Sequence, residues 1–398
     1  MTADAAPLRL QLQAPRRVAA GSLPLRGTAR VRQAVRIRMV DDDGHVGLGE
    51  ALPLPGYSRD DAEMAERVLA AIAMRCRADG LFVPLSFTAA ADAPDDDHAE
   101  RADDSAEPAV EHGPAARLRA ALRPWEDELA EAPSARFALE CALTDLLARR
   151  RGQSAAHWLA DGRALQAVPV SLLLPDDDRE VVASASAAVA AGFAILKLKI
   201  ARRDRAEADE DALLAALRGA MDAARPAAAR PALLRLDANG AYGVGRAAGR
   251  LVTLRRFGVE LVEEPAASRA LLALPPLALP WAADESLVEP ALARALLALP
   301  RERRPTALVL KPAQLGLARC LQLAQAAAAL GIGVIVTHSL DGDLGHAAAC
   351  ALAAALPQAP WPCGLAPHAG LRQPPPLQPW LPAPVAPGLG VDDWGDDR

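Results

Sequence analysis

The chain has 398 residues, enough for two domains, and 52% of them are hydrophobic, so it can bury a large core. The formal net charge is −6 and no RNA- or DNA-binding signature is present, which argues against a nucleic-acid partner. No apolar run reaches the roughly 18 residues of a membrane span, and residues 1–13 lack a signal-peptide pattern. Five scattered cysteines without Cys-x-x-Cys spacing indicate a reducing compartment, so we expect a cytoplasmic protein without a membrane partner.

The first 85 residues or so predict an α+β unit. Val35, Ile37 and Met39 alternate with arginines, and the turn 41–44 precedes a returning segment 45–50, which indicates a hairpin. The next loop, 49–58, is too rich in Pro and Gly to be regular. A helix is expected from about Asp60 to Ala78, with Ser58, followed by Asp61, as its cap.

Residues 88–113 are acidic and contain almost nothing to bury. Between Asp92 and Glu111 there are nine acids and one arginine, so we expect an insert without ordered structure and with no further role. Two helices, 114–132 and 134–151, are expected after it. We predict that residues 1–135 form a capping domain.

From about Val168 onward, apolar runs alternate with helical patterns. This alternation predicts that residues 136–370 form a (β/α)7-8 TIM-like barrel, whose last strand is Cys363–Pro367. Residues 371–398 are rich in proline, and we expect them either to return to the capping domain or to be a plain linker.

Charged residues follow the apolar runs of this region at regular spacing. Lys197 and Lys199 end one run, and Asp237, Glu263, Asp284 and Lys311 end the next four, at intervals of 26, 21 and 27 residues after Asp237. One strand, loop and helix fit each interval. Because reactive groups of such barrels lie at the carboxyl ends of the strands, these side chains are predicted to form one polar ring.

Three carboxylates that meet at one place need a cation between them. Oxygen ligands without Cys or His favour Mg²⁺, with Mn²⁺ as the alternative ion. A lysine beside another cation loses its proton more easily, so Lys197 can make Lys199 a usable base. The combination indicates removal of a proton alpha to the carboxylate of a small molecule, with the metal stabilising the enediolate.

Five motifs in order carry a resemblance to a known family: Lys197-x-Lys199, Asp237-x-Asn239, Glu263-Glu264-Pro265, Asp284-Glu285-Ser286 and Lys311-Pro312. The series resembles the enolase superfamily, muconate-lactonizing subgroup. Within it, the stretches 49–58, 308–312 and 336–345 are most similar to the o-succinylbenzoate synthase family. The chain departs from that family at Thr337-His338-Ser339, where the family is serine-rich, and at Tyr242, where a tryptophan is common.

The resemblance implies a mechanism. Asp237, Glu263 and Asp284 would hold Mg²⁺, Lys199 would take the alpha proton, and Lys311 would stabilise the enediolate from the opposite face. The reaction would be syn dehydration of 2-succinyl-6-hydroxy-2,4-cyclohexadiene-1-carboxylate in menaquinone biosynthesis. The candidates for substrate contact or for support of the site are Arg235, Asn239, Ser339, Tyr57 and Ser58.

Other interpretations stay open at this point. An N-acylamino acid racemase or dipeptide epimerase would use the same two lysines, a muconate cycloisomerase is a weaker alternative, and a barrel that only binds a ligand would need no base. His338 lies at a strand end, where a histidine could act as a general base. Because the sixth strand ends in Lys311 rather than in an acid that could orient a histidine, we expect His338 to be structural or to line the substrate site. The protein could be a monomer or a homo-oligomer.

Overall fold

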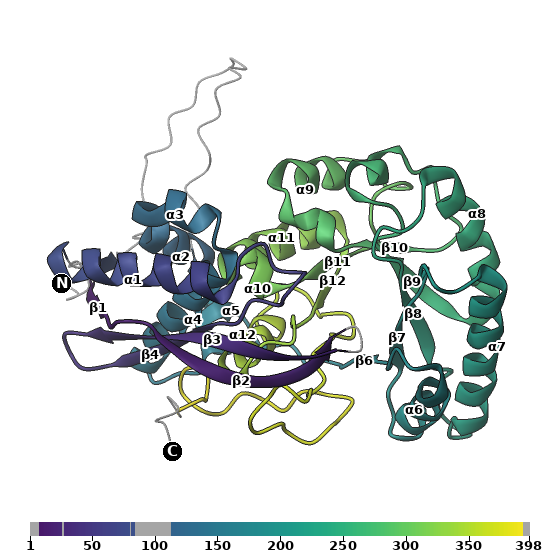
Figure 1. Ribbon diagram of the computed structural model, residues 1–398, viewed down its shortest axis with the longest axis horizontal. Helices are drawn as coiled ribbons and strands as arrows, with labels where there is room; N and C mark the ends of the chain where they lie inside the picture. Colours follow the sequence, from purple (N-terminus) through teal and green to yellow (C-terminus); the bar gives the residue numbers. More distant parts are fainter. Residues whose placement is uncertain (1–7, 26–27, 80, 84–112, 393–398) are drawn as a thin grey trace, which may run out of the picture.

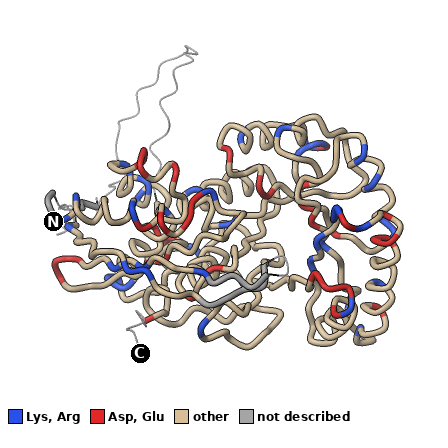
Figure 2. Tube along the Cα trace, in the orientation of Figure 1, with Lys and Arg blue, Asp and Glu red and all other residues tan. Residues whose placement is uncertain are grey.

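The computed structural model describes residues 8–25, 28–79, 81–83 and 113–392. The predicted acidic insert 88–113 lies outside these ranges except for its last residue. Figure 1 shows an N-terminal antiparallel sheet with its helices on one side and a curved parallel sheet with helices outside it on the other. Acidic and basic residues are distributed over both parts (Figure 2).

The N-terminal sheet contains the predicted hairpin. Its strands are β1 (Leu8–Leu12), β2 (Arg16–Leu25), β3 (Thr28–Asp41), β4 (Val46–Ala51) and β5 (Leu81–Val83). They are antiparallel in the order β2-β3-β1-β5, and β4 pairs with β3 so that Val35 lies opposite Ala51. Val35, Ile37 and Met39 are fully buried, as their alternation predicts.

Helices cover this sheet and connect it to the barrel. They are α1 (Ala62–Asp79), α2 (Pro114–Leu122), the 3-10 turn η1 (Arg123–Trp125), α3 (Glu126–Ala130), α4 (Pro133–Arg150) and α5 (Ala155–Ala160). The cap of α1 was predicted wrongly. The Asp61 carboxylate accepts a hydrogen bond from the Met64 amide at 2.8 Å, whereas the Ser58 hydroxyl accepts one from the Leu54 amide within the preceding loop.

The second part is the predicted barrel. Its strands are β6 (Leu172–Leu173), β7 (Ile195–Lys199), β8 (Leu233–Asp237), β9 (Val259–Glu263), β10 (Trp281–Ala283), β11 (Ala307–Leu310) and β12 (Gly333–Val336), each parallel to the next. In place of an eighth regular strand, Cys363 bridges Val170 and Gly364 bridges Thr337, which brings the two edges of the sheet together. The fold is therefore α/β, with a TIM-like barrel and an N-terminal α+β capping part.

The segments between these strands are helical. They are α6 (Asp178–Ala190), α7 (Glu207–Ala224), α8 (Val244–Leu254), η2 (Arg255–Phe257), η3 (Ser268–Ala273), η4 (Glu285–Val288), α9 (Pro290–Leu297), α10 (Pro312–Leu315), α11 (Leu317–Leu330) and α12 (Asp343–Ala354). No helix among the described residues is long and apolar enough to cross a bilayer.

Candidate active site

The register of the parallel strands brings the predicted charged residues to one end of the barrel. Lys199 on β7 lies beside Asp237 on β8, and Asp237 lies beside Glu263 on β9. Asp284 directly follows β10 and Lys311 directly follows β11. Residues that are far apart in sequence therefore meet because each one ends a neighbouring parallel strand.

The three carboxylates form one cluster. Ligand oxygens of Asp237, Glu263 and Asp284 lie within 4.8 Å of one another, and all three residues are buried. Buried like charges repel at this separation, so the cluster needs positive charge. An all-oxygen set of this kind fits a hard divalent ion such as Mg²⁺.

Two lysine ammonium groups contact these carboxylates directly. Lys197 Nζ lies 2.9 Å from Asp237 Oδ2 and 2.5 Å from Glu263 Oε2, and Lys311 Nζ lies 2.6 Å from Asp284 Oδ2. Burial favours the neutral amines, but the surrounding carboxylates outweigh it and raise the pKa of both lysines. Lys197 and Lys311 are therefore held as cations.

The carboxylates respond unequally to this environment. Burial tends to raise the pKa of Asp237, but Lys197 and Lys311 more than offset it and hold the pKa below its usual value. Burial raises the pKa of Asp284 to about 7, although Lys311 opposes the shift. Three carboxylates face only two lysine cations in the cluster, so the donor set fits an additional cation.

A cavity of about 290 Å³ opens above the cluster. Its lining combines chemistry-bearing side chains with apolar ones: Leu54, Tyr57, Ser171, Leu172, Leu173, Lys197, Lys199, Asp237, Asn239, Glu285, Lys311, Gln314, Thr337, His338, Ser339, Leu340, Gly364, Ala366, Pro367 and His368. Lys199 Nζ lies 5.4 Å from the centroid of the Tyr57 ring, within the range of a cation–π contact. The cavity can therefore accept a small molecule beside both the carboxylates and the lysines.

Neighbouring polar residues orient the charged cluster. Glu264 accepts hydrogen bonds from the Asp284 amide at 2.7 Å and from the amide and hydroxyl of Ser286 at 3.2 and 3.1 Å. Asn239 donates its backbone N–H to Asp237 and its side-chain amide to Glu285. Glu263 thus belongs to the cluster, while Glu264 accepts hydrogen bonds from the backbone that carries Asp284.

Two of the candidates for substrate contact or for support of the site do not line the cavity. Arg235 is 1% exposed, and its guanidinium contacts Glu260 at 2.7 Å and the Pro362 carbonyl at 2.6 Å, so it does not line the cavity. Ser58 closes the turn on Leu54 and also lies outside the lining. Arg235 lies two residues before Asp237 on β8, so the two side chains share one face of the strand, with Arg235 one layer deeper in the barrel.

Histidines lie at the side of the cavity formed by β12 and the eighth-strand segment. His338 accepts a hydrogen bond from the Leu340 amide through Nδ1, so the proton is on Nε2, which faces the Ala366 carbonyl at 3.2 Å. Burial and the neighbouring His368 and His346 keep its pKa well below the usual value. His338 is thus a neutral, structural member of the lining. The sequence did not single out His368, because this residue follows the eighth strand position and no hydrophobic periodicity marks it.

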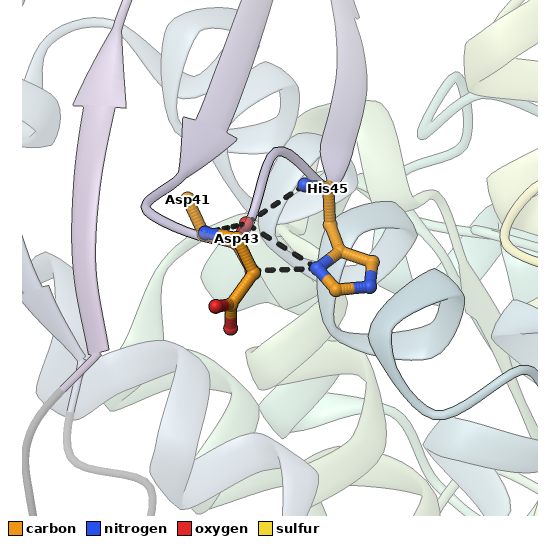
Figure 3. Close-up of side chains that lie close together, drawn as sticks. All are labelled: Asp41, Asp43 and His45. Carbon is orange, nitrogen blue, oxygen red and sulfur yellow. Dashed lines mark hydrogen bonds and ion pairs between the residues drawn. The ribbon is translucent and has the colours of Figure 1, made fainter.

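A second group of possible metal ligands lies in the turn between β3 and β4. Figure 3 shows Asp41, Asp43 and His45 there, with His45 bound to Asp41 through its ring and its backbone amide. The Arg150 guanidinium lies 2.7 Å from Asp41 Oδ2 and 2.5 Å from Asp43 Oδ2. An arginine cation already balances these acids, so we place no metal there.

The similarity of the chain to known proteins agrees with this geometry. Residues 180–393 match the family model described as "Enolase C-terminal domain-like". An o-succinylbenzoate synthase from Desulfotalea psychrophila is 32% identical over 78% of this chain and 80% of its own. The chain belongs to the enolase superfamily. A second o-succinylbenzoate synthase, from Thermobifida fusca, is 36% identical over 50% of this chain and 59% of its own.

Solved structures agree on the fold of this enolase superfamily member. A dipeptide epimerase from Methylococcus capsulatus, complexed with Mg and the dipeptide L-Arg-D-Lys, superimposes with a TM-score of 0.71 at 23% identity over 97% of this chain and 99% of its own. The muconate lactonizing enzyme from Pseudomonas putida gives 0.71 at 21% identity over 96% and 95%. These two likenesses show the fold. The similarity to the two o-succinylbenzoate synthases makes the chain an o-succinylbenzoate synthase-like enzyme of the superfamily.

Proposed function

We propose that the protein is an o-succinylbenzoate synthase, a carbon–oxygen lyase. It would dehydrate 2-succinyl-6-hydroxy-2,4-cyclohexadiene-1-carboxylate in menaquinone biosynthesis, by syn elimination through an enediolate. The observation that carries the proposal is the cluster of three buried carboxylates, one of which, Asp237, lines a cavity together with Lys197, Lys199 and Lys311. The names of the sequence relatives support dehydration among the reactions that such a site can perform.

Asp237, Glu263 and Asp284 would hold the metal, which we propose to be Mg²⁺. The structure similar to this chain that was solved with Mg supports this choice, as does the all-oxygen donor set. When bound, the ion supplies positive charge for the substrate carboxylate and for the charge that develops on it.

The side chains of the chain would carry the proton transfers. Lys199 would remove the proton alpha to the substrate carboxylate. Among the residues that the structure describes, Lys199 forms no ion pair with the three carboxylates of the cluster, and its ammonium group lies against the Tyr57 ring. Lys311, held as a cation by Asp284, would stabilise the developing negative charge from the other side. Protonated Lys199 would then deliver its proton to the departing hydroxyl, and loss of water makes the ring aromatic.

The first test is the variant Lys199→Ala. With Mg²⁺ and the cyclohexadiene carboxylate, we expect kcat to fall by at least about 100-fold, because a general base contributes about that much. Mg²⁺ affinity, measured by titration calorimetry, should change little, which separates loss of the base from loss of the metal. Dehydration by the variant within tenfold of the wild type would refute the assignment of Lys199.

A racemase of N-acylamino acids or an epimerase of dipeptides is the second candidate. The observation that favours it is the presence of both Lys199 and Lys311 at the cavity, since proton transfer at one carbon needs a base on each face. Incubation with N-succinyl amino acids in deuterated water separates the two functions. Exchange of the alpha proton without any dehydration of the cyclohexadiene carboxylate would favour this second candidate.

A further inference from the structure

Two loops from different parts of the chain form one wall of the cavity. The capping loop, residues 52–58 after β4, contributes Leu54 and Tyr57. The β12 loop, residues 337–342, contributes Thr337, His338, Ser339 and Leu340. The shape of the cavity therefore depends on how these loops are held relative to each other.

The Arg32 side chain connects them. Arg32 is on β3 and is 2% exposed. Its Nη1 donates a hydrogen bond to the Leu340 carbonyl, and its Nη2 donates one to the Leu52 carbonyl at 3.0 Å. One planar guanidinium thus spans from the capping sheet to both loops.

Hydrogen bonds within each loop hold its shape, so a shift of the loop carbonyl that Arg32 contacts also displaces the residues that face the cavity. In the capping loop, the amides of Tyr57 and Ser58 donate to the Leu54 carbonyl at 3.0 and 2.9 Å, and the Ser58 hydroxyl accepts from the Leu54 amide. In the β12 loop, Leu340 has a positive φ of 57°, and its amide donates to His338. Such a backbone conformation persists only where surrounding contacts hold it.

The contacts of Arg32 show that its shape matters as well as its charge. Both of its hydrogen bonds go to carbonyl oxygens, while the nearby carboxylates have other donors: Arg36 lies 2.9 Å from Glu50, and the Ser339 amide donates to Asp341. A guanidinium fork reaches two carbonyls at once, whereas a lysine ammonium is a single point charge on a flexible stem.

We propose that Arg32 is a positioning residue that sets the substrate-facing wall of the cavity by holding the capping loop and the β12 loop together. Through the capping loop it also places Tyr57, whose ring lies against Lys199. The proposal rests on the function proposed above only in assuming that a substrate enters this cavity. Displacements of about 1 Å in a positioning residue can change rates strongly, so the effect is measurable.

The test uses Arg32→Lys, with Arg150→Lys as the matched control. The Arg150 guanidinium also joins two acceptors, Asp41 and Asp43, in the turn between β3 and β4, at the opposite end of β4 from the capping loop. For Arg32→Lys we expect about a tenfold rise in KM for the cyclohexadiene carboxylate and a smaller change in kcat. Hydrogen exchange should be faster in residues 52–58 and 337–342 and unchanged in β3. Arg150→Lys should leave the exchange of both loops as in the wild type.

If the wild type does not dehydrate this substrate, the proposed function fails. Hydrogen exchange in residues 52–58 and 337–342 still tests whether Arg32 holds the two loops. The proposal would be overturned if Arg32→Lys had the same hydrogen exchange and the same KM as the wild type, because a positive charge at this position would then be enough to hold the loops. Arg32→Gln is the second variant. Faster exchange spread evenly over the capping sheet in both variants would also overturn it, since the role would then be general stability.

Discussion

Neighbouring carboxylates in the motif Glu263-Glu264 have separate tasks. Glu263 belongs to the acidic cluster, and Glu264 holds the backbone on either side of Glu285 through Asp284 and Ser286. Consecutive residues at a strand end point in different directions, so one motif supplies both a candidate ligand and its support. Glu264 has a positive φ of 40°, which its contacts maintain.

The variant Glu264→Ala tests this support. Removing the acceptor of the Asp284 amide should loosen the Asp284 carboxylate, and we expect Mg²⁺ affinity to fall by about 10- to 100-fold. Titration calorimetry measures the affinity directly. Glu264→Gln keeps an oxygen that can accept from the Asp284 amide, so it should retain most of the affinity. Wild-type affinity in Glu264→Ala would show that Asp284 needs no such support.

At the scale of elements, the sequence predicted what local patterns determine. The hairpin β3–β4 follows from alternation, and the barrel strands follow from apolar runs that end in charged residues. The long helix predicted over 114–132 is instead interrupted at Arg123–Trp125, where Pro124 lies. The contacts of Arg32 and the depth of Arg235 depend on packing between distant segments, which no local pattern encodes.

Helices α4 and α11 are joined by a buried acid. The Glu140 carboxylate on α4 accepts hydrogen bonds from the Leu317 and Ala318 amides at the start of α11. Gly316 leaves the space for it, since a Cβ there would lie 2.7 Å from Glu140 Oε2. Burial raises the pKa of Glu140 to about 7, although Arg136 and these amides oppose the shift.

This pKa predicts a pH dependence of stability. A glutamate raised from 4.5 to about 7 binds its proton more tightly in the folded state, so its contribution is fully present below pH 4.5 and is lost as pH rises through 7. Glu140→Gln should abolish that loss. Relative to the wild type, its free energy of urea unfolding should increase between pH 5 and 8 by on the order of 3 kcal/mol.

Glu131→Gln is the control for Glu140→Gln, because Glu131 is an exposed acid that pairs with Arg59. It should show no comparable change over the same pH range. If the stability of Glu140→Gln runs parallel to that of the wild type from pH 5 to 8, the buried acid does not titrate in this range.

At the scale of the whole molecule, the C-terminal segment has a specific anchor on the rest of the chain. The buried Asp145 on α4 accepts hydrogen bonds from the Leu48 amide on β4 at 2.9 Å and from the Leu389 amide at 2.7 Å. The capping sheet, α4 and the C-terminal segment therefore meet at one carboxylate. This junction fixes the capping sheet, and with it the loop that carries Tyr57, on the barrel.

Alanine substitutions at two glycines of the C-terminal segment separate the effect of backbone strain from that of the contact with Asp145. Gly388 and Gly390 both have positive φ, 65° and 72°, so alanine at either should cost about 1–2 kcal/mol of unfolding free energy. At Gly388 a Cβ would also lie 2.0 Å from Asp145 Oδ1, whereas at Gly390 the nearest atom is the Ala386 Cβ at 3.3 Å. Gly388→Ala should therefore lose about 1–3 kcal/mol more than Gly390→Ala in urea unfolding. Equal losses in the two variants would mean that the contact of the segment with Asp145 does not stabilise the molecule.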